Sequence, residues 1–314
     1  MSGADEFGEI ERLFRPLTRG AAGAFELMDD AAVLPGRPGF DLVVTKDAVV
    51  AGVHFPVGED PGLIARKLLR VNLSDLAAKA AEPFAAFLAI AWPPDFDADA
   101  RAAFAGGLGQ DLAAFGVALM GGDTVSTPGP FTASLTALGW VPAGGMIRRA
   151  GAAVGDLVLV SGTIGDGALG LKAVRGEIAD ADGYLTGRYR LPNPRTDLRD
   201  ALRAHATAGA DVSDGLVADA RHIAEASGVR LVLDLDLTPL SAAARSWLAA
   251  QPDRARALLA LATGGDDYEV VCVMPAGVRP AGFTPIGRVV AGAGVEVHAG
   301  GAVLDPGPGG WRHE

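Results

Sequence analysis

The 314-residue chain has little of several residue types, and these shortages exclude whole classes of protein. It contains a single cysteine, Cys272, so an intrachain disulfide framework is excluded and a reducing compartment is expected. Cys272 stands in the apolar stretch 270–273, where a lone thiol usually serves core packing. No cluster of histidine and cysteine suggests a zinc site.

Positive charge and long apolar runs are scarce as well. The 27 Lys and Arg residues are outnumbered by 38 Asp and Glu, and the net charge of −11 gives no support for binding nucleic acid or an anionic membrane. The longest apolar run, residues 84–92, ends at Pro93 and suits a buried strand better than a membrane span. The acidic start M-S-G-A-D-E-F lacks the parts of a signal peptide. We therefore expect a cytoplasmic protein.

What the chain does have is a large apolar fraction, 49%, with 21% charged residues, which is typical of a globular protein with a substantial core. Strand patterns alternate with helical ones, which predicts an α/β fold. The expected strands are 41–50, with a polar interruption at 45–47, and 84–92, 117–120, 131–141, 156–161, 229–237 and 270–274. The expected helices are 7–17, 59–71, 95–115, 168–174, 216–226 and 241–261, the last with a break near Pro252, and residues 179–194 are expected to form a loop. The loop at 142–145 predicts two domains, residues 1–142 and 143–314.

The stretch 71–83, V-N-L-S-D-L-A-A-K-A-A-E-P, allows two interpretations. In the structural one, Ser74 or Asp75 caps a short helix that ends before Pro83. In the functional one, Asp75 is a ligand at a strand-to-helix turn.

Similar carboxylates recur at expected strand ends and glycine turns, and these are Asp30, Asp47, Asp75, Asp123, Asp211, Asp214, Asp266 and Asp267. Each of them alone suits a turn or a cap. Together they suit a shared site for Mg²⁺, which takes oxygen ligands and is commonly bound by carboxylates and substrate phosphates. Such a metal lets an acidic protein bind a phosphorylated substrate.

Other nucleotide and hydrolase signatures are missing. The glycine-rich stretch 162–167 matches neither the dinucleotide fingerprint nor the Walker A pattern. No G-x-S-x-G or Cys–His pattern indicates acyl transfer.

The motifs, taken in order, resemble those of the thiamine-monophosphate kinase family. They are D-D-A-A-V at 29–33, T-K-D at 45–47 with G-V-H-F at 52–55, V-N-L-S-D-L-A-A at 71–78, G-G-D-T at 121–124, D-V-S-D-G-L at 211–216 and G-D-D-Y-E at 265–269. The resemblance spans nearly the whole chain, and the family belongs to the aminoimidazole-ribonucleotide-synthetase-like ATP-binding superfamily.

This resemblance implies transfer of the γ-phosphoryl of ATP to thiamine monophosphate, on a two-domain α/β fold whose N-terminal sheet pairs across a homodimer. It implies several Mg²⁺ ions, with ligand positions at Asp30, Thr45, Lys46, Asp47, Asp75, Asp123, Asp211 and Asp214. Asp75, Asp123 and Asp214 carry the catalytic role. Nucleotide contacts match Gly122, Asp123, Ser213 and an arginine at Arg148 or Arg149, of which Arg149 is the choice. Substrate contacts match His54, Asp266 and Trp311.

Several positions depart from the family pattern. Lys46 replaces a hydroxyl residue, so one metal ligand is either missing or supplied by a backbone carbonyl. Asp266 replaces the commoner Glu, Met28 stands where Gly is usual, and the chain ends W-R-H-E. These departures bear on substrate geometry more than on reaction class.

Two alternatives stay open from the sequence. One is another enzyme of the superfamily, such as a selenophosphate synthetase, an aminoimidazole ribonucleotide synthetase or a hydrogenase-maturation dehydratase. The synthetase of selenophosphate would need a reactive cysteine near the N-terminus and the dehydratase one at the C-terminus, and Cys272 is in neither place. The other is a non-catalytic ATP- and Mg²⁺-binding paralogue, supported only by Lys46 and the altered C-terminal residues.

Overall fold

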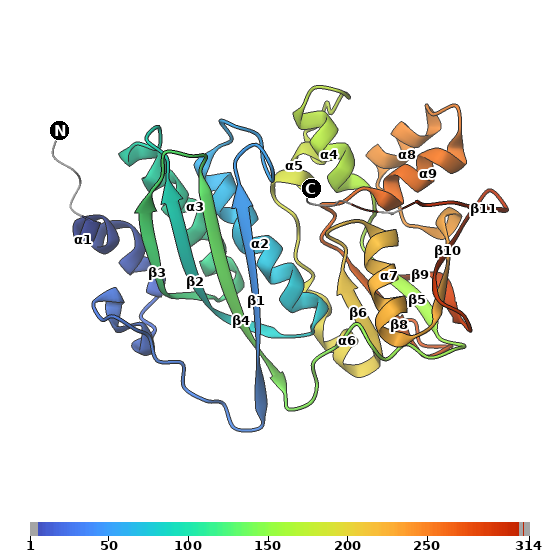
Figure 1. Cartoon of the computed structure of the whole chain (residues 1–314), viewed down its shortest axis with the longest axis horizontal. Coiled ribbons are helices and arrows are strands. Elements are labelled where there is room, and N and C mark those ends of the chain that lie inside the picture. The colour runs from blue at the N-terminus through green and yellow to red at the C-terminus, as the bar shows by residue number, and fades with distance from the viewer. Residues whose placement is uncertain (1–5, 308–309, 311–314) are drawn as a thin grey trace. The chain divides into compact units, whose positions relative to one another are not determined.

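The structure, a computed structural model, describes residues 6–307 and 310 and divides the chain into two compact units. Unit 1 comprises Met1–Leu76 and Ala81–Gly145, and unit 2 comprises Ala77–Ala80 and Met146–Glu314. Each unit is built around its own sheet, and helices α2 and α3 lie on one face of the sheet of unit 1 (Figure 1).

The sheet of unit 1 has the order β1-β4-β2-β3, in which β2 and β3 are parallel and the other neighbours antiparallel. Its strands are β1 (Phe40–Val50), β2 (Glu82–Trp92), β3 (Ala118–Ser126) and β4 (Thr132–Pro142). The helices are α1 (Glu6–Glu9), α2 (Pro61–Ala78) and α3 (Ala98–Phe115), with short helical turns η1 (Ile10–Phe14), η2 (Arg15–Thr18) and η3 (Ala22–Leu27).

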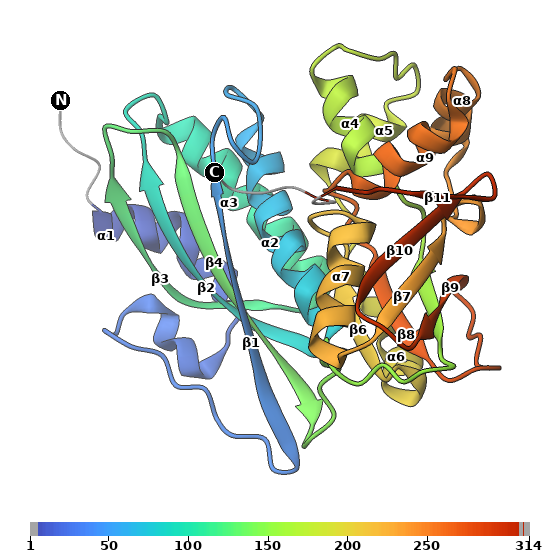
Figure 2. The ribbon, with the colours of Figure 1, turned by 45° about the vertical axis from the view of Figure 1, so that its right-hand side comes forward.

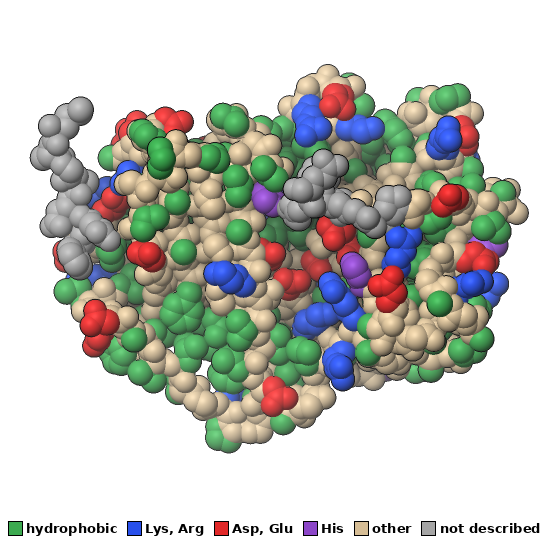
Figure 3. All heavy atoms as spheres, viewed as in Figure 1, with side chains coloured by type: hydrophobic (Ala, Val, Ile, Leu, Met, Phe, Trp, Pro, Cys, Tyr) green, Lys and Arg blue, Asp and Glu red, His purple; other side chains and the backbone are tan. Residues whose placement is uncertain are grey.

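Strand β1 has two different faces because successive side chains alternate. Val43 and Val49 are buried in the core with α2 and α3. Leu42 and Val44 lie on the opposite face, and their side chains are 41% and 55% exposed. Figure 3 shows hydrophobic side chains gathered on this outer face of the sheet. Exposed apolar surface of this kind commonly marks an interaction site.

The sheet of unit 2 has the order β11-β10-β7-β9-β5-β8-β6 (Figure 2). Its strands are β5 (Leu157–Ser161), β6 (Ala208–Asp211), β7 (Arg230–Asp234), β8 (Val270–Met274), β9 (Phe283–Val290), β10 (Gly294–Ala299) and β11 (Ala302–Leu304). Its helices are α4 (Asp166–Val174), α5 (Tyr184–Arg190), α6 (Arg199–His205), α7 (Leu216–Ser227), α8 (Ala242–Ala249) and α9 (Arg254–Thr263), with turns η4 (Thr196–Leu198) and η5 (Leu235–Leu237).

The predicted α/β class is confirmed, with three local corrections. Helix α2 runs without a break through Ser74 and Asp75, so neither residue caps a helix start. No proline or glycine interrupts residues 63–78, and the buried apolar face outweighs the weak helix propensity of Ser and Asp. The stretch 121–124 lies inside strand β3 instead of in a turn, because Gly122 and Asp123 pair with β2. The region 179–194, expected as loop, contains helix α5.

Within the described residues, none of the helices combines the length and the apolar character needed to cross a bilayer.

Candidate active site

A cluster of polar side chains forms in unit 1 where strand β1 packs against helix α2. Thr45 Oγ1 donates a hydrogen bond to Asp75 Oδ2 at 2.5 Å. The backbone N–H of Asp47 donates to Asn72 Oδ1 at 3.2 Å. Thr45 and Asp47 are two residues apart on the strand and share one face, and Asn72 and Asp75 are three apart on the helix and also share a face. The four side chains therefore converge.

Two of these groups are carboxylates, and Asp75 acts on the pKa of Asp47. Burial, followed by the charge and the hydrogen bond of Asp75, raises the pKa of Asp47 to about 6. Two close carboxylates repel each other unless a proton or a cation lies near them. Carboxylate and hydroxyl oxygens are the ligands that a hard divalent cation prefers. The donor set of Thr45, Asp47 and Asp75 thus fits Mg²⁺.

A cavity of about 420 Å³, also in unit 1, brings Asp30 and Asp123 together. The segment that contains Asp29 and Asp30 lines it, as do Gly122 and Asp123 of strand β3. Apolar side chains complete the lining, and these include Phe14, Leu27, Phe87, Ile90 and Met120. A cavity of this size, apolar with a few convergent polar groups, suits a small ligand.

Gly122 occupies a position in this lining that excludes any side chain. A Cβ atom there would lie 2.0 Å from the carbonyl oxygen of Leu88 on the paired strand β2. The cavity wall thus depends on a close backbone approach that only glycine permits.

Two loops of unit 2 form one hydrogen-bonded element. The 211–215 loop begins with the last residue of β6, and the 264–269 loop precedes β8. The backbone N–H groups of Asp266 and Tyr268 donate to the carbonyls of Ser213 and Val212 at 2.9 and 2.8 Å. The Val212 N–H donates to the carbonyl of Glu269 at 2.7 Å. These bonds continue the antiparallel pairing of β6 with β8. They place Asp266 beside the loop that carries Asp211 and Asp214.

Asp219, in the first turn of α7, holds the 211–215 loop. Its Oδ2 atom accepts the backbone N–H groups of Ser213, Asp214 and Gly215 at 3.1, 3.2 and 3.2 Å. Burial and then the charge of Asp214 raise the pKa of Asp219 to about 7, while the charge of Arg149 acts in the opposite direction. The guanidinium of Arg149 is therefore close enough to influence this loop electrostatically.

Two family models match the chain. The AIR synthase related protein N-terminal domain covers residues 28–141, and the corresponding C-terminal domain covers residues 153–300. The thiamine-monophosphate kinase of Caulobacter vibrioides is 54% identical over 98% of this chain and 90% of that protein. The chain belongs to the thiamine-monophosphate kinase family.

Solved structures of thiamine-monophosphate kinases agree with this assignment. The enzyme from Stenotrophomonas maltophilia K279a is 38% identical and superposes with a TM-score of 0.80 over 93% of this chain and 98% of that one. AaThiL complexed with AMPPCP and TMP is 29% identical with the same TM-score of 0.80, over 98% of this chain and 97% of that one. The family resemblance expected from the motifs is thereby confirmed.

In this kinase fold the remaining predicted residues lie as follows. His54 accepts the Val50 backbone N–H on Nδ1 at 3.0 Å, so in its neutral form the ring carries its proton on Nε2. Arg148 and Arg149 are both exposed, and Arg149 is the one whose charge acts on Asp219. Trp311 lies outside the described residues.

The side chain of one predicted ligand position points away from the other ligands. Lys46 stands between Thr45 and Asp47 on β1, so its side chain points to the outer face of the sheet and is exposed. An ammonium group also has no lone pair for a metal. Both options that the sequence left for Lys46, a missing ligand or a backbone carbonyl, therefore stay open.

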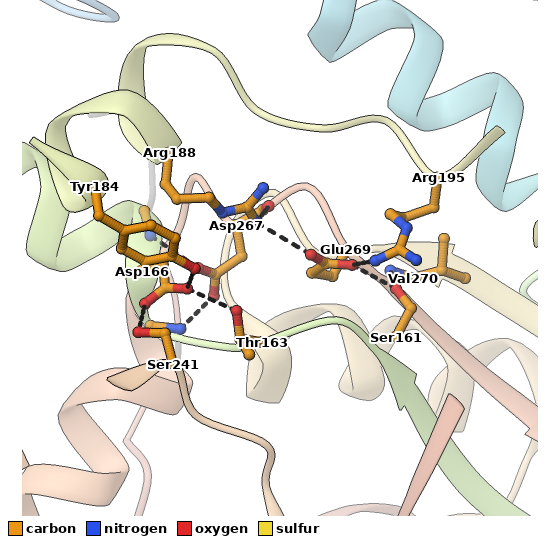
Figure 4. Close-up of polar contacts among 12 residues, drawn as sticks. Ser161, Thr163, Asp166, Tyr184, Arg188, Arg195, Ser241, Asp267, Glu269 and Val270 are labelled. Atoms are coloured by element: carbon orange, nitrogen blue, oxygen red, sulfur yellow. Dashed lines mark hydrogen bonds and ion pairs between the residues drawn. The ribbon is translucent and has the colours of Figure 1, made fainter. Parts of the chain in front are cut away.

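Sequence reasoning did not find the arginines that support the 264–269 loop, and it grouped Asp267 with the metal carboxylates although both Asp267 oxygens accept backbone N–H groups of Gly165 and Gly167. Asp267 and Glu269 are almost fully buried, and Arg188 and Arg195 pair with Glu269 at 3.1 Å each (Figure 4). Arg188 comes from helix α5, in a region that was expected to be loop, and Arg195 follows that region. Glu269, directly before an apolar strand, could have indicated such a partner, because a charge is buried only when it is paired.

Asp267 predicts a pH dependence of stability. Its carboxylate accepts the N–H groups of Gly165 and Gly167 at 2.7 and 2.9 Å, but its burial outweighs them and raises its pKa to about 8 from 3.8. A raised folded-state pKa gives stability that is full below the unfolded-state value and is lost as the pH rises through the folded-state value. We expect this group to lower the unfolding free energy by up to about 1.4 kcal/mol per pH unit between about pH 5 and 7.

Urea unfolding of the metal-free protein across this range measures the slope. The Asp267→Asn variant, which cannot titrate here, should show a flatter dependence. If the unfolding free energy falls equally steeply with pH in both proteins, groups other than Asp267 cause the pH dependence.

Proposed function

We propose that this chain transfers the γ-phosphoryl group of ATP to thiamine monophosphate and releases thiamine diphosphate and ADP. The observation that carries the proposal is the 54% identity to a thiamine-monophosphate kinase over nearly the full length of both chains. The relative AaThiL, complexed with AMPPCP and TMP, supports the choice of an adenine nucleotide and thiamine monophosphate as ligands.

Mg²⁺ is the cofactor that fits the side chains. In unit 1 the proposed ligands are Asp30, Thr45, the Lys46 carbonyl, Asp47, Asp75 and Asp123, and in unit 2 they are Asp211 and Asp214. The raised pKa of Asp47 supports this, since the same carboxylate pair that favours a proton also favours a cation. When bound, the metal supplies neutralisation of phosphate charge and stabilises the leaving oxygen.

The chain's own residues then act by binding and orientation. The acceptor is a phosphate oxygen that is already ionised at neutral pH, so no strong general base is needed. Gly122, Asp123, Ser213 and Arg149 are assigned to the nucleotide, and backbone and guanidinium groups suit its phosphates. His54 offers an Nε2–H to the substrate phosphate, given the bond at its Nδ1. Positioning of the reactants for in-line attack provides most of the catalysis.

Asp266 and Trp311 are assigned to the thiamine moiety. Both suit a positively charged heteroaromatic ring, since a carboxylate neutralises its charge and an aromatic face stacks on it. We also propose a cytoplasmic location, because the single cysteine, Cys272, is buried as a free thiol and thiols stay reduced in the cytosol.

A panel of acceptors coupled to ADP release tests the assignment against the rest of the superfamily. Thiamine monophosphate should support ADP release, and the substrates of selenophosphate synthetase and aminoimidazole ribonucleotide synthetase should not. Binding of ATP and Mg²⁺ in a calorimeter without any thiamine diphosphate would favour the non-catalytic paralogue.

A homodimer formed through the sheet of unit 1 is the proposed assembly. Leu42 pairs with Trp140 across β1 and β4, and Trp140 stacks on Phe84 with ring centroids 5.0 Å apart. Together with Val44 these side chains give the sheet an apolar outer face. A charge at Val44 should therefore separate the subunits, because burying an unpaired charge is costly.

We expect Val44→Lys to shift the mass measured by light scattering from dimer to monomer. Val57→Lys is the matched control, since Val57 is more exposed, at 80%, and lies outside the sheet. A dimer that persists in Val44→Lys would place the interface elsewhere.

A further inference from the structure

The 264–269 loop has a strained backbone at the residue assigned to the substrate. Asp266 and Tyr268 have φ angles of 67° and 52°, which lie in the left-handed region. This conformation is unfavourable for a residue with a side chain, so the surroundings must enforce it. The direction of the Asp266 side chain depends on these backbone angles. Whatever enforces them therefore also places the Asp266 carboxylate.

One side of the loop is fixed by backbone contacts. Asp266 and Tyr268 donate their N–H groups to the 211–215 loop, as described above. On the other side, the Asp267 carboxylate is fully buried and accepts the N–H groups of Gly165 and Gly167 at the start of helix α4. A Cβ at Gly167 would lie 2.3 Å from the backbone of Asp266, so the loop rests directly on that helix.

Arg188 of helix α5 joins the two ends of the strained segment. Its Nη2 atom donates to the carbonyl oxygen of Asp267 at 3.0 Å and to Glu269 Oε1 at 3.1 Å. Figure 4 shows its guanidinium lying between these two residues. The guanidinium thus spans Tyr268, one of the two residues with positive φ.

Helix α5 is itself anchored. Tyr184 donates its hydroxyl to Asp166 Oδ2 at 2.9 Å, and Asp166 also accepts Thr163 and Ser241 hydroxyls at 2.6 and 2.5 Å. Asp166 is fully buried on helix α4, which also binds Asp267. Helix α5, which carries Arg188, is therefore hydrogen-bonded to helix α4, and the 264–269 loop packs on the same helix α4.

We propose that Arg188 is a positioning residue for thiamine monophosphate, holding the backbone of the 264–269 loop so that Asp266 faces the substrate in one fixed geometry. This rests on the proposed function and on the assignment of Asp266 to the thiamine moiety. The simpler alternative is that Arg188 only neutralises the buried Glu269.

Arg195 separates the two interpretations. It also donates to Glu269, through Nη1 at 3.1 Å, and its side chain is 16% exposed against 15% for Arg188. The guanidinium of Arg195 donates to the carboxylates of Glu269 and Asp197, whereas that of Arg188 also donates to the backbone carbonyl of Asp267. Loss of either arginine removes one partner of the Glu269 side chain, and only loss of Arg188 also removes a hydrogen bond to the loop backbone.

The test compares Arg188→Met with Arg195→Met in steady-state kinetics and thermal unfolding. We expect Arg188→Met to raise KM for thiamine monophosphate at least about tenfold, as small misplacements of a binding group can do. KM for ATP should stay within about twofold in both variants, and Arg195→Met should leave both KM values within that range. Arg188→Lys should give an intermediate KM for thiamine monophosphate, because one ammonium replaces a fork of donors.

Equal changes of KM for thiamine monophosphate in Arg188→Met and Arg195→Met would overturn the proposal, and so would equal changes for ATP and thiamine monophosphate in Arg188→Met. If Arg188→Met does not fold, Arg188→Lys decides on the same criteria. A wild-type protein that never forms thiamine diphosphate would contradict the proposed function, whereas an active wild type with an unaffected Arg188 variant would contradict this inference alone.

Discussion

Asp75→Asn is expected to keep the fold and to lower kcat by at least about 100-fold, the scale on which one preorganised electrostatic group contributes to catalysis. An asparagine oxygen can still accept the hydrogen bond from Thr45, so helix α2 keeps its place against strand β1. The lost charge is the one that, after burial, raises the pKa of Asp47, and it completes the proposed ligand set. Steady-state kinetics at saturating Mg²⁺, with circular dichroism as the check on folding, measure the effect.

Asp97→Asn is the control for this prediction. The Asp97 carboxylate caps helix α3 by accepting the N–H groups of Asp99 and Ala100, and asparagine caps helices about as well. It should leave kcat unchanged. Asp123→Asn, in the cavity, should behave like Asp75→Asn. Near-normal kcat in both Asp75→Asn and Asp123→Asn would rule out a metal-centred mechanism at these carboxylates.

Gly122→Ala is expected to cost about 3 kcal/mol of unfolding free energy, the upper end of the range for overpacked cores. The added methyl group would lie 2.0 Å from the Leu88 carbonyl oxygen, and that neighbour is backbone which cannot rotate away. The parallel pairing of β2 with β3 would have to open at the wall of the cavity. Denaturant unfolding gives the change in stability, and ATP binding should weaken with it.

Gly106→Ala provides the matched control. Gly106 lies within helix α3, and a Cβ there meets no atom within 4 Å. Alanine in a helix interior should add up to about 1 kcal/mol of stability. A Gly122→Ala protein as stable as Gly106→Ala would mean that the β2–β3 contact is not as close as the structure has it.

The sequence could predict those elements whose patterns are local. Helix α7 begins after Gly215 and ends at Gly228 in the left-handed conformation, close to the range expected from its caps. Strand β8 is a continuous apolar run and has the predicted bounds. The break near Pro252 separates α8 from α9 as expected.

Elements set by tertiary contacts were the ones that local patterns misjudged. Ser74 and Asp75 resemble helix caps, but they lie inside helix α2 because the surrounding apolar residues bury a single long face. Gly121 and Gly122 resemble a turn, but a neighbouring strand requires their small size. The spacing of charges along the chain could not predict the ion pair of Arg188 with Glu269, because these residues are 81 positions apart and are brought together only by the fold.

In the candidate site, too, some contacts could be expected from the motifs and others form only in the fold. Carboxylates at 45–47 and 72–75 could be proposed as partners from the motifs, and the structure brings Thr45, Asp47 and Asp75 into contact. The role of Asp219 depends on three backbone N–H groups gathered by the 211–215 loop. No sequence pattern displays such a contact, because the donors become neighbours only when the loop closes over the helix.

Quantification of both products, in one reaction of the purified chain with ATP, thiamine monophosphate and Mg²⁺, tests the proposed phosphoryl transfer most directly. Phosphorus NMR or chromatography should find one thiamine diphosphate for each ADP, and removal of Mg²⁺ by a chelator should stop both. ADP formed without thiamine diphosphate, or a yield that is unchanged after chelation, would contradict it.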